Sequence, residues 1–409
     1  MTRWQSVSPY PDAAPEAEQT VNGALIHRTN GRRNCFGRWI SQAERAAEGK
    51  HYRFTVRCLP LNVRDAFANV HALLTWRNAG GCFLQRDYID RRQTPDGLVF
   101  DRVLPAPGGT ASVQAELCFK WSDTGQVTWS CAAISEVPSV LPKTCRVVSA
   151  FTTLPGGKEN NLRAVLDVID RAAAANPDIL CLGETQLTPN VPFFESAVTV
   201  DGPEVALLCG KAKLYNMYII MGLSLLEEGL YRNAAVLIGC GGNVEGVYRK
   251  VHLPLAEAEW GYTPGDDYCV FDTDFGKIGI LICWDQSFPE AARRLTERGA
   301  SVLFIPTYGN SPLQARARAS DNGVFVAVSA TRWGGDFPCY IIDPFGDLIA
   351  SCEGGEARAF GFCAADLDLS RQYKTIWYSV GDCYGEHGPV LANEYRVDLH
   401  NKDRGNASE

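Results

Sequence analysis

The chain has 409 residues, 46% of them hydrophobic and 21% charged, which is typical of a globular protein and, at this length, of two domains. Its 39 basic and 47 acidic residues give a formal net charge of −8, which disfavours a nucleic acid or an anionic membrane as partner. No run of 18 or more apolar residues occurs, and residues 1–34 form a polar lead-in without an apolar signal segment, so we expect a cytoplasmic protein. Its 15 cysteines are then expected to be reduced.

The spacing of these cysteines matches neither a zinc site nor a redox pair, so we expect no metal and no cofactor. Residues 35–140 contain several short segments in which apolar and polar residues alternate, as in Tyr52–Arg57. This period of two predicts an all-β sandwich domain, which loosely resembles carbohydrate-binding jelly rolls. Four tryptophans could form a ligand platform there, although core aromatics are the commoner case, and we assign them no ligand: Trp39, Trp76, Trp121 and Trp129.

A linker is expected at residues 138–143, and strands then alternate with helices over residues 145–369. This order predicts an α/β domain, with helices either on both faces of one sheet or on the outer faces of two packed sheets. Residues 370–409 form a tail that is rich in aromatic residues around Trp377, and we expect this tail to pack on a partner subunit.

One cysteine lies where a strand gives way to a helix. Lys277–Ile282 is typical of a buried strand, and Phe288–Arg298 has the period of a helix. A thiol at Cys283 would face the positive end of that helix, which lowers its pKa and favours the nucleophilic thiolate. Cys283 is therefore the candidate nucleophile, although a lone cysteine is more often a small buried apolar residue.

Two charged residues also follow predicted strands. Asp178–Leu182 leads to Glu184, and Val247–Arg249 leads to Lys250. Because α/β sheets gather their chemistry at strand ends, we expect both residues to converge on Cys283. The alternative is an ordinary salt bridge at a sheet edge.

With these residues in this order, the chain resembles the carbon-nitrogen hydrolase (nitrilase) superfamily. The resemblance covers roughly residues 145–369 and rests on four motifs: GET at 183–185, YRKVHLP at 248–254, the segment 259–265, and ICWDQSFPE at 282–290. It implies a four-layer αββα sandwich with the site at one end of the sheets, a Glu-Lys-Cys triad, and a homodimer or higher homo-oligomer.

The triad has defined roles in the cleavage of an amide. Glu184 would act as base and acid, Cys283 would form a thioester, and Lys250 would stabilise the oxyanion together with the backbone N–H of Trp284. The superfamily usually adds a second glutamate. Glu259 is the preferred candidate because of its distance to Tyr262–Gly265, and Glu257 is the alternative. His252 could also pair with the cysteine, but we expect it to make a supporting hydrogen bond instead.

The segment 283–293 is most similar to N-carbamoyl amine hydrolases, so the expected substrate is a small linear, non-peptide amide and not a nitrile. Gln286 and Ser287 stand where carbamoyl-amino-acid hydrolases tend to carry arginine, so a clamp for a substrate carboxylate is not evident, although Arg332 could supply one. Two alternatives remain: acyl transfer to an amine, and a catalytically inactive protein whose sandwich binds a carbohydrate or a partner.

Overall fold

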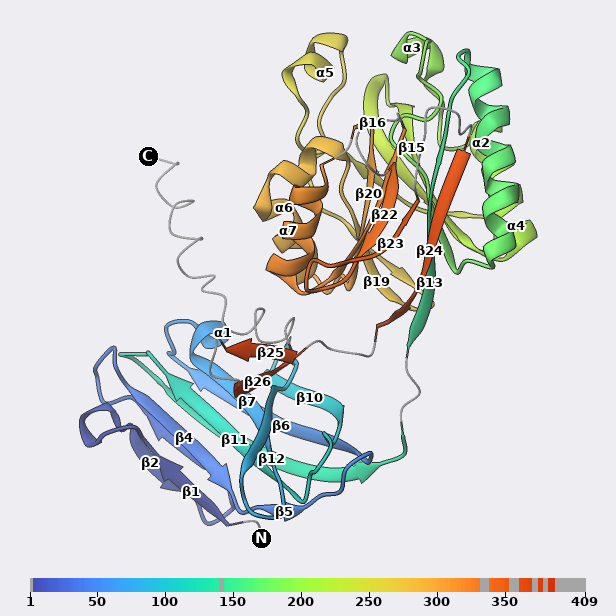
Figure 1. The fold of residues 1–409 in the computed structure, drawn as a ribbon. Helices are drawn as coiled ribbons and strands as arrows, with labels where there is room; N and C mark the ends of the chain where they lie inside the picture. Colours follow the sequence, from blue (N-terminus) through green and yellow to red (C-terminus); the bar gives the residue numbers. More distant parts are fainter. Residues whose placement is uncertain are drawn as a thin grey trace, which may run out of the picture. The chain divides into compact units, whose positions relative to one another are not determined.

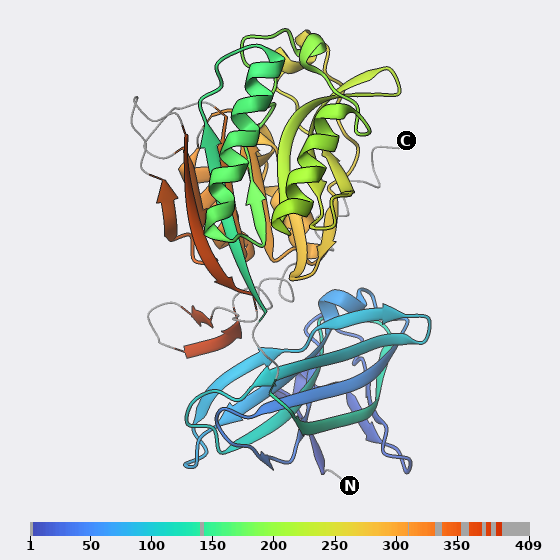
Figure 2. The same cartoon turned by 90° about the vertical axis from the view of Figure 1, so that its right-hand side faces the viewer.

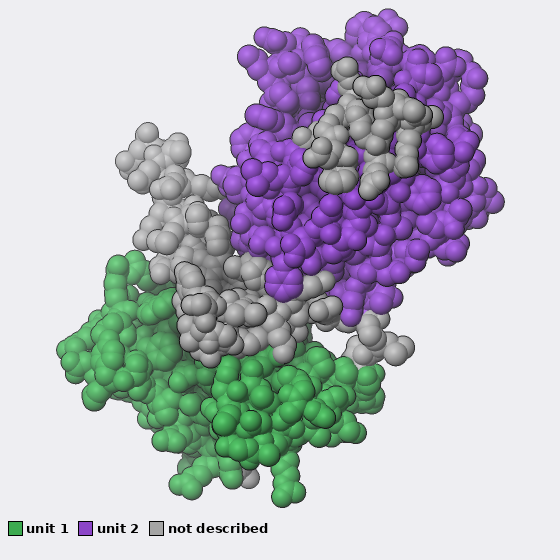
Figure 3. All heavy atoms as spheres, viewed as in Figure 1, with its two compact units in different colours: residues 1–141, 372–409 green, residues 142–371 purple. Residues whose placement is uncertain are grey.

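The structure is a computed structural model (Figure 1) that describes residues 3–139, 143–309, 311–331, 338–352, 360–369, 374–377 and 382–386. The chain divides into two compact units (Figure 3). Unit 1 comprises residues 1–141 and 372–409, and unit 2 comprises residues 142–371.

Unit 1 is built from two antiparallel sheets of six strands each. The first has the order β1-β4-β11-β7-β8, with β5 paired to β11, and the second has the order β2-β3-β12-β6-β10-β9. The bounds of the first sheet's strands are β1 Trp4–Val7, β4 Phe36–Ser41, β5 Glu44–Arg45, β7 Val70–Arg77, β8 Phe83–Tyr88 and β11 Ser112–Lys120. Those of the second are β2 Glu16–Gln19, β3 Leu25–Arg28, β6 His51–Leu61, β9 Arg91–Thr94, β10 Gly97–Pro105 and β12 Gln126–Val137.

The prediction of a polar lead-in at residues 1–34 was wrong, because this segment supplies three strands. β1 pairs with β4 of the first sheet, and β3 pairs with β12 of the second. The segment escaped recognition because all four residues of β2 are exposed, so β2 carries no apolar alternation.

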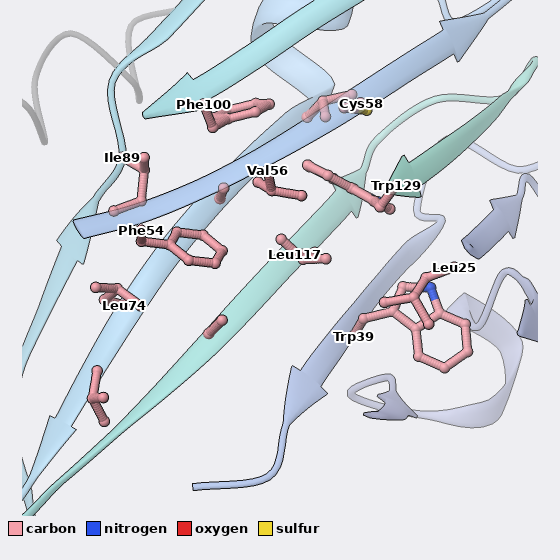
Figure 4. Close-up of a cluster of buried hydrophobic side chains, with 14 of the residues drawn as sticks. Leu25, Trp39, Phe54, Val56, Cys58, Leu74, Ile89, Phe100, Leu117 and Trp129 are labelled. Carbon is pink, nitrogen blue, oxygen red and sulfur yellow. The ribbon is translucent and has the colours of Figure 1, made fainter. Parts of the chain in front are cut away.

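Both sheets of unit 1 contribute to one hydrophobic core. Tyr52, Phe54, Val56 and Cys58 alternate with more exposed residues along β6, as the period of two predicted. Figure 4 shows Phe54 and Val56 in a cluster with side chains from the other sheet. Of the four tryptophans, three are core residues and Trp121 alone is 45% exposed, so they do not form a common platform.

Unit 2 contains two further six-stranded sheets, of mixed parallel and antiparallel pairing. One has the order β17-β16-β15-β14-β13-β24 and the other the order β18-β19-β20-β21-β22-β23. The strands of the first are β13 Thr144–Thr152, β14 Ile179–Cys181, β15 Tyr218–Glu227, β16 Leu230–Ile238, β17 Val244–Arg249 and β24 Phe360–Asp368. Those of the second are β18 Val270–Thr273, β19 Gly276–Ile280, β20 Val302–Thr307, β21 Phe325–Ala330, β22 Cys339–Ile342 and β23 Leu348–Cys352.

Helices cover the outer face of each sheet in unit 2 (Figures 1 and 2). α2, Lys158–Ala172, and α4, Pro203–Tyr215, bury their apolar residues against the first sheet, and α6, Pro289–Glu297, and α7, Pro312–Asn322, bury theirs against the second. The inner faces of the two sheets meet, and the hydroxyl of Ser329 on β21 donates to the carbonyl of Cys181 on β14 at 2.8 Å. This is the nitrilase-like arrangement of layers, and it decides between the two α/β possibilities.

The remaining elements are short. They are α1 Ala66–Asn69, α3 Phe193–Ser196, α5 Leu255–Trp260 and the 3-10 turns Pro11–Ala13, Ala173–Ala175 and Cys283–Ser287. Of the tail, the structure describes one antiparallel hairpin, β25 Lys374–Trp377 with β26 Asp382–Glu386, whose second strand lies against β8. The rest of the tail is outside the described residues. No described helix is both long enough and apolar enough to span a membrane.

A glycine on β15, Gly222, leaves room for the backbone segment that carries Glu184. A Cβ atom at Gly222 would lie 2.5 Å from the Cα atom of Glu184 and 2.6 Å from the carbonyl oxygen of Gly183, closer than such atoms approach. Gly210 on α4, by contrast, has no other group within 4 Å of such a Cβ atom.

We therefore expect Gly222→Ala to lower the free energy of unfolding by about 1–3 kcal/mol, because backbone atoms must shift to admit the methyl group. The same shift displaces Glu184, so activity should fall as well. The matched control Gly210→Ala should be neutral or stabilising by about 0.5–1 kcal/mol. Chemical denaturation of the two variants checks this, and equal stabilities would contradict it.

Candidate active site

Glu184 and Lys250 form a buried ion pair at the strand ends of the first sheet in unit 2. Glu184 follows β14 and Lys250 follows β17, and their side chains are 2% and 0% exposed. The Lys250 Nζ atom donates to Glu184 Oε1 at 2.8 Å. The predicted convergence of these two residues is thus present, and it is a buried contact instead of a surface salt bridge.

The second carboxylate at the lysine belongs to Glu257, not to Glu259. Lys250 Nζ donates to Glu257 Oε1 at 2.6 Å, whereas Glu259 is exposed. Both glutamates lie on α5, and residues two apart on a helix point in different directions, so only one of them can face the lysine. The preference for Glu259 was wrong because it rested on the distance to Tyr262–Gly265 and did not consider the helix.

Asn233 on β16 is a site residue that the sequence analysis missed. Its Nδ2 atom donates to Glu184 Oε1 at 2.7 Å and to Glu257 Oε2 at 3.1 Å. Since both partners are acceptors, the orientation of the amide is fixed. The Asn233 backbone carbonyl accepts from the Lys250 N–H at 2.9 Å. A polar residue at the start of the apolar run Ala234–Ile238 of β16 was the only signal in the sequence, and it does not name the partners of Asn233.

Cys283 begins a 3-10 turn of five residues, Cys283–Ser287, and two residues, Leu281 and Ile282, separate this turn from the end of β19 at Ile280. Its φ of +46° lies in the left-handed region, which non-glycine residues seldom adopt and which is often found at functional sites. The thiol is partly buried and lies close to Glu184, Lys250 and Thr307. All three members of the predicted triad are therefore neighbours.

The pKa of the Cys283 thiol is raised, not lowered. Burial is the main cause and the Glu184 carboxylate adds to it, while Lys250 and hydrogen bonds to Thr307 and Tyr308 act in the opposite direction. The expected lowering by a helix terminus was wrong because α6 begins only at Pro289, so a short 3-10 turn stands between the thiol and the helix. The Cys283 side chain at rest is therefore a thiol, not a thiolate.

Lys250 keeps its proton despite its burial. Burial alone would lower its pKa, but the neighbouring Glu184, Cys283 and Glu257 raise it above the ordinary value. Burial also raises the pKa of the Glu257 carboxyl, and the contact with Lys250 offsets part of that effect. The site thus holds one stable ammonium group between two carboxyl groups.

A cavity of about 320 Å³ opens onto Cys283, Glu184, Glu257 and Asn233. Its wall is largely apolar or aromatic, and these residues are Pro189, Phe193, Pro254, Ala256, Trp260, Tyr262 and Tyr308. Among the described residues that line the cavity, none is an arginine, a lysine or a histidine. The wall therefore offers a substrate carboxylate no cation in the described part of the chain. Arg332 lies outside the described residues.

Two further residues that the sequence analysis singled out, Trp284 and His252, lie close in the chain to Cys283 or to Lys250. Trp284 directly follows Cys283, its side chain is 47% exposed, and its backbone N–H lies in the first turn of the 3-10 helix, where N–H groups lack an intrahelical partner. His252 stacks on Phe288 at 3.8 Å, and its Nδ1 atom lies 3.1 Å from Asp285 Oδ1. His252 therefore has the supporting hydrogen bond that was expected. No cluster of metal-ligand residues occurs in the described ranges.

Comparison with known proteins gives a consistent result. A family model described as carbon-nitrogen hydrolase matches residues 149–376. An omega-amidase of Xenopus laevis is 31% identical over 241 residues, which are 52% of this chain and 84% of that protein. An N-carbamoylputrescine amidase of Solanum lycopersicum is 38% identical over 218 residues, 45% of this chain and 72% of that protein. The solved structure of an amidase of Nesterenkonia AN1, from the nitrilase superfamily, superposes with a TM-score of 0.51 and is 21% identical in sequence. The match covers 63% of this chain and 96% of that chain, and it supports the fold.

The two glutamates of α5 provide a matched pair of variants. Glu257→Gln should lower kcat/KM by about 10²-fold, because it removes one of the two carboxylates that position Lys250, and a displacement near 1 Å has that effect. Glu259→Gln changes an exposed residue of the same helix and should leave kcat/KM unchanged. Steady-state kinetics on any amide that the enzyme accepts checks this. The opposite order of effects would restore Glu259 as the second glutamate.

The raised pKa of Cys283 predicts how its reactivity depends on pH. The rate of alkylation by iodoacetamide should still rise as the pH passes the ordinary thiol value of 9.0, because the thiolate fraction has not reached its maximum there. Mass spectrometry of the peptide that contains Cys283 separates it from the other cysteines. A rate that is already constant below about pH 8 would contradict the raised pKa.

Proposed function

The chain belongs to the carbon-nitrogen hydrolase family, and from this premise we propose that it hydrolyses a linear, non-peptide amide through a thioester on Cys283. The observation that carries this proposal is the buried cluster of Glu184, Lys250, Glu257 and Asn233 beside Cys283, next to a cavity whose other lining residues are mostly apolar or aromatic. The cluster provides a base, a fixed positive charge and a nucleophile within one site.

Glu184 acts first as the base. Its Oε1 atom is held by Lys250 and Asn233, while its Oε2 atom has no hydrogen-bond partner among the described residues. The free oxygen can take the proton of the Cys283 thiol, whose raised pKa makes such a base necessary. The sulfur then attacks the amide carbon.

The oxyanion that forms is stabilised by Lys250 and by the backbone N–H of Trp284. A positively charged group held in a buried site stabilises developing negative charge more strongly than it would in water. Collapse of the intermediate breaks the C–N bond, Glu184 returns its proton to the leaving amine or ammonia, and a thioester remains on Cys283. Glu184 then removes a proton from water, the water oxygen attacks the thioester, and the C–S bond breaks to release the acid. The proton passes from Glu184 back to the Cys283 sulfur, which restores the resting site.

An N-carbamoyl amine is the favoured substrate. Among the described residues that line the cavity, none is an arginine, lysine or histidine that could pair with a substrate carboxylate. Aromatic and proline side chains instead suit an apolar or weakly polar carbon chain. The identity of 38% over 218 residues to an N-carbamoylputrescine amidase of Solanum lycopersicum supports the same choice.

For unit 1 we infer a β-sandwich of the jelly-roll type. Two antiparallel sheets that share a single core of buried side chains support this description. No ligand is assigned to it.

A substrate panel tests the proposed function. Ammonia release should be measured with N-carbamoyl amines, N-carbamoyl amino acids, simple carboxamides and nitriles at equal concentrations. We expect the highest kcat/KM for an N-carbamoyl amine, and we expect Cys283→Ala to abolish turnover while the control Cys209→Ala, on α4, keeps it. Turnover confined to nitriles, or activity retained by Cys283→Ala, would contradict the proposal, and a wild-type protein inert to the whole panel would favour a binding role.

A further inference from the structure

Asp285 is a fully buried carboxylate two residues after Cys283, and the proposed mechanism does not use it. Its side chain accepts four hydrogen bonds. Oδ2 accepts from the backbone N–H of Ile282 at 3.0 Å and from the Tyr248 hydroxyl at 2.8 Å. Oδ1 accepts from the backbone N–H of His252 at 2.8 Å and lies 3.1 Å from His252 Nδ1.

The four donors come from both sides of the site. Tyr248 and His252 lie two residues before and two residues after Lys250, and Ile282 immediately precedes Cys283. The segment with Lys250 continues β17 of one sheet, whereas the turn with Cys283 follows β19 of the other sheet. A single carboxylate thus connects the segment of the lysine to the turn of the nucleophile.

We infer that Asp285 is a positioning residue that fixes the Cys283 thiol relative to the Lys250 ammonium group. The inference rests on the proposed function of these two residues. The same carboxylate accepts from Ile282, which immediately precedes the left-handed backbone of Cys283, and from His252, which lies two residues after Lys250. A small displacement between nucleophile and oxyanion donor is enough to reduce the rate strongly.

The charge of Asp285 is what the arrangement requires. Two carboxylate oxygens supply enough lone pairs for four donors, and hydrogen bonds to a charged acceptor are the stronger kind. An asparagine at 285 has the same shape but replaces one oxygen by an NH₂ group. That group would face either the Ile282 N–H and Tyr248 hydroxyl or the two His252 donors. Asp285→Asn therefore breaks the connection on one side without opening a cavity.

Two readouts distinguish positioning from a purely structural role. We expect Asp285→Asn to lower kcat about tenfold or more with KM nearly unchanged, since substrate contacts remain. We also expect a changed second-order rate for alkylation of Cys283 by iodoacetamide. As a matched control, Asp87→Asn alters a buried aspartate of unit 1 that accepts from Trp76 Nε1 at 2.6 Å. That change should reduce stability and leave both readouts unaltered.

Tyr248→Phe keeps the test decisive if Asp285→Asn does not fold, because it removes one hydroxyl and one of the four hydrogen bonds. It should lower kcat severalfold, and adding it to Asp285→Asn should have less effect than it has alone, since both changes act on one connection. Unchanged kcat and unchanged Cys283 alkylation in Tyr248→Phe, or full additivity of the two changes, would overturn the inference. Failure of the proposed function would look different: the wild-type protein would turn over no substrate, while the alkylation readout would still report on Asp285.

Discussion

The ammonium group of Lys250 is fully buried, and the site is arranged around the need to keep it charged there. A buried cation without partners would lose its proton or destabilise the fold. Glu184 and Glu257 each accept a hydrogen bond from it, and Asn233 holds both carboxylates in place. Glu184, Lys250, Glu257 and Asn233 follow β14, follow β17, lie on α5 and lie on β16, respectively. The hydrogen bonds around the Lys250 ammonium group therefore connect four segments of the chain.

The same cluster explains the state of the nucleophile. Burial, together with the nearby Glu184 carboxylate, raises the pKa of the Cys283 thiol, so this thiol stays protonated at rest. In the proposed mechanism, Glu184 takes the proton of this thiol when substrate is present. Separate roles for the two glutamates follow, because Glu184 faces the thiol whereas Glu257 holds the lysine and is itself held by Asn233.

The sequence identified the residues that lie on regular, buried elements and failed where a short element or an exposed strand intervened. Glu184 and Cys283 could be predicted because each follows a run of apolar residues, and Lys250 because it follows the predicted strand Val247–Arg249 in the order Glu, Lys, Cys of the family. Glu257 was passed over because a helix of six residues, α5, was not recognised. β2 was missed because none of its side chains is buried, and the pKa of Cys283 was misjudged because a 3-10 turn precedes α6. Asn233 required the structure, since its importance depends on two carboxylates that lie 49 and 24 positions away in the chain.

The central claim is that Cys283 carries the acyl group during turnover and that Glu184 controls both its formation and its hydrolysis. Acid quenching during turnover of a reactive amide, followed by mass spectrometry of the Cys283 peptide, tests this directly. The account predicts an acyl adduct on Cys283 in the wild-type protein, a longer-lived adduct in Glu184→Gln once it is formed from an activated ester, and none in Cys283→Ala. Turnover without any adduct on Cys283, or an adduct on another residue, would contradict it.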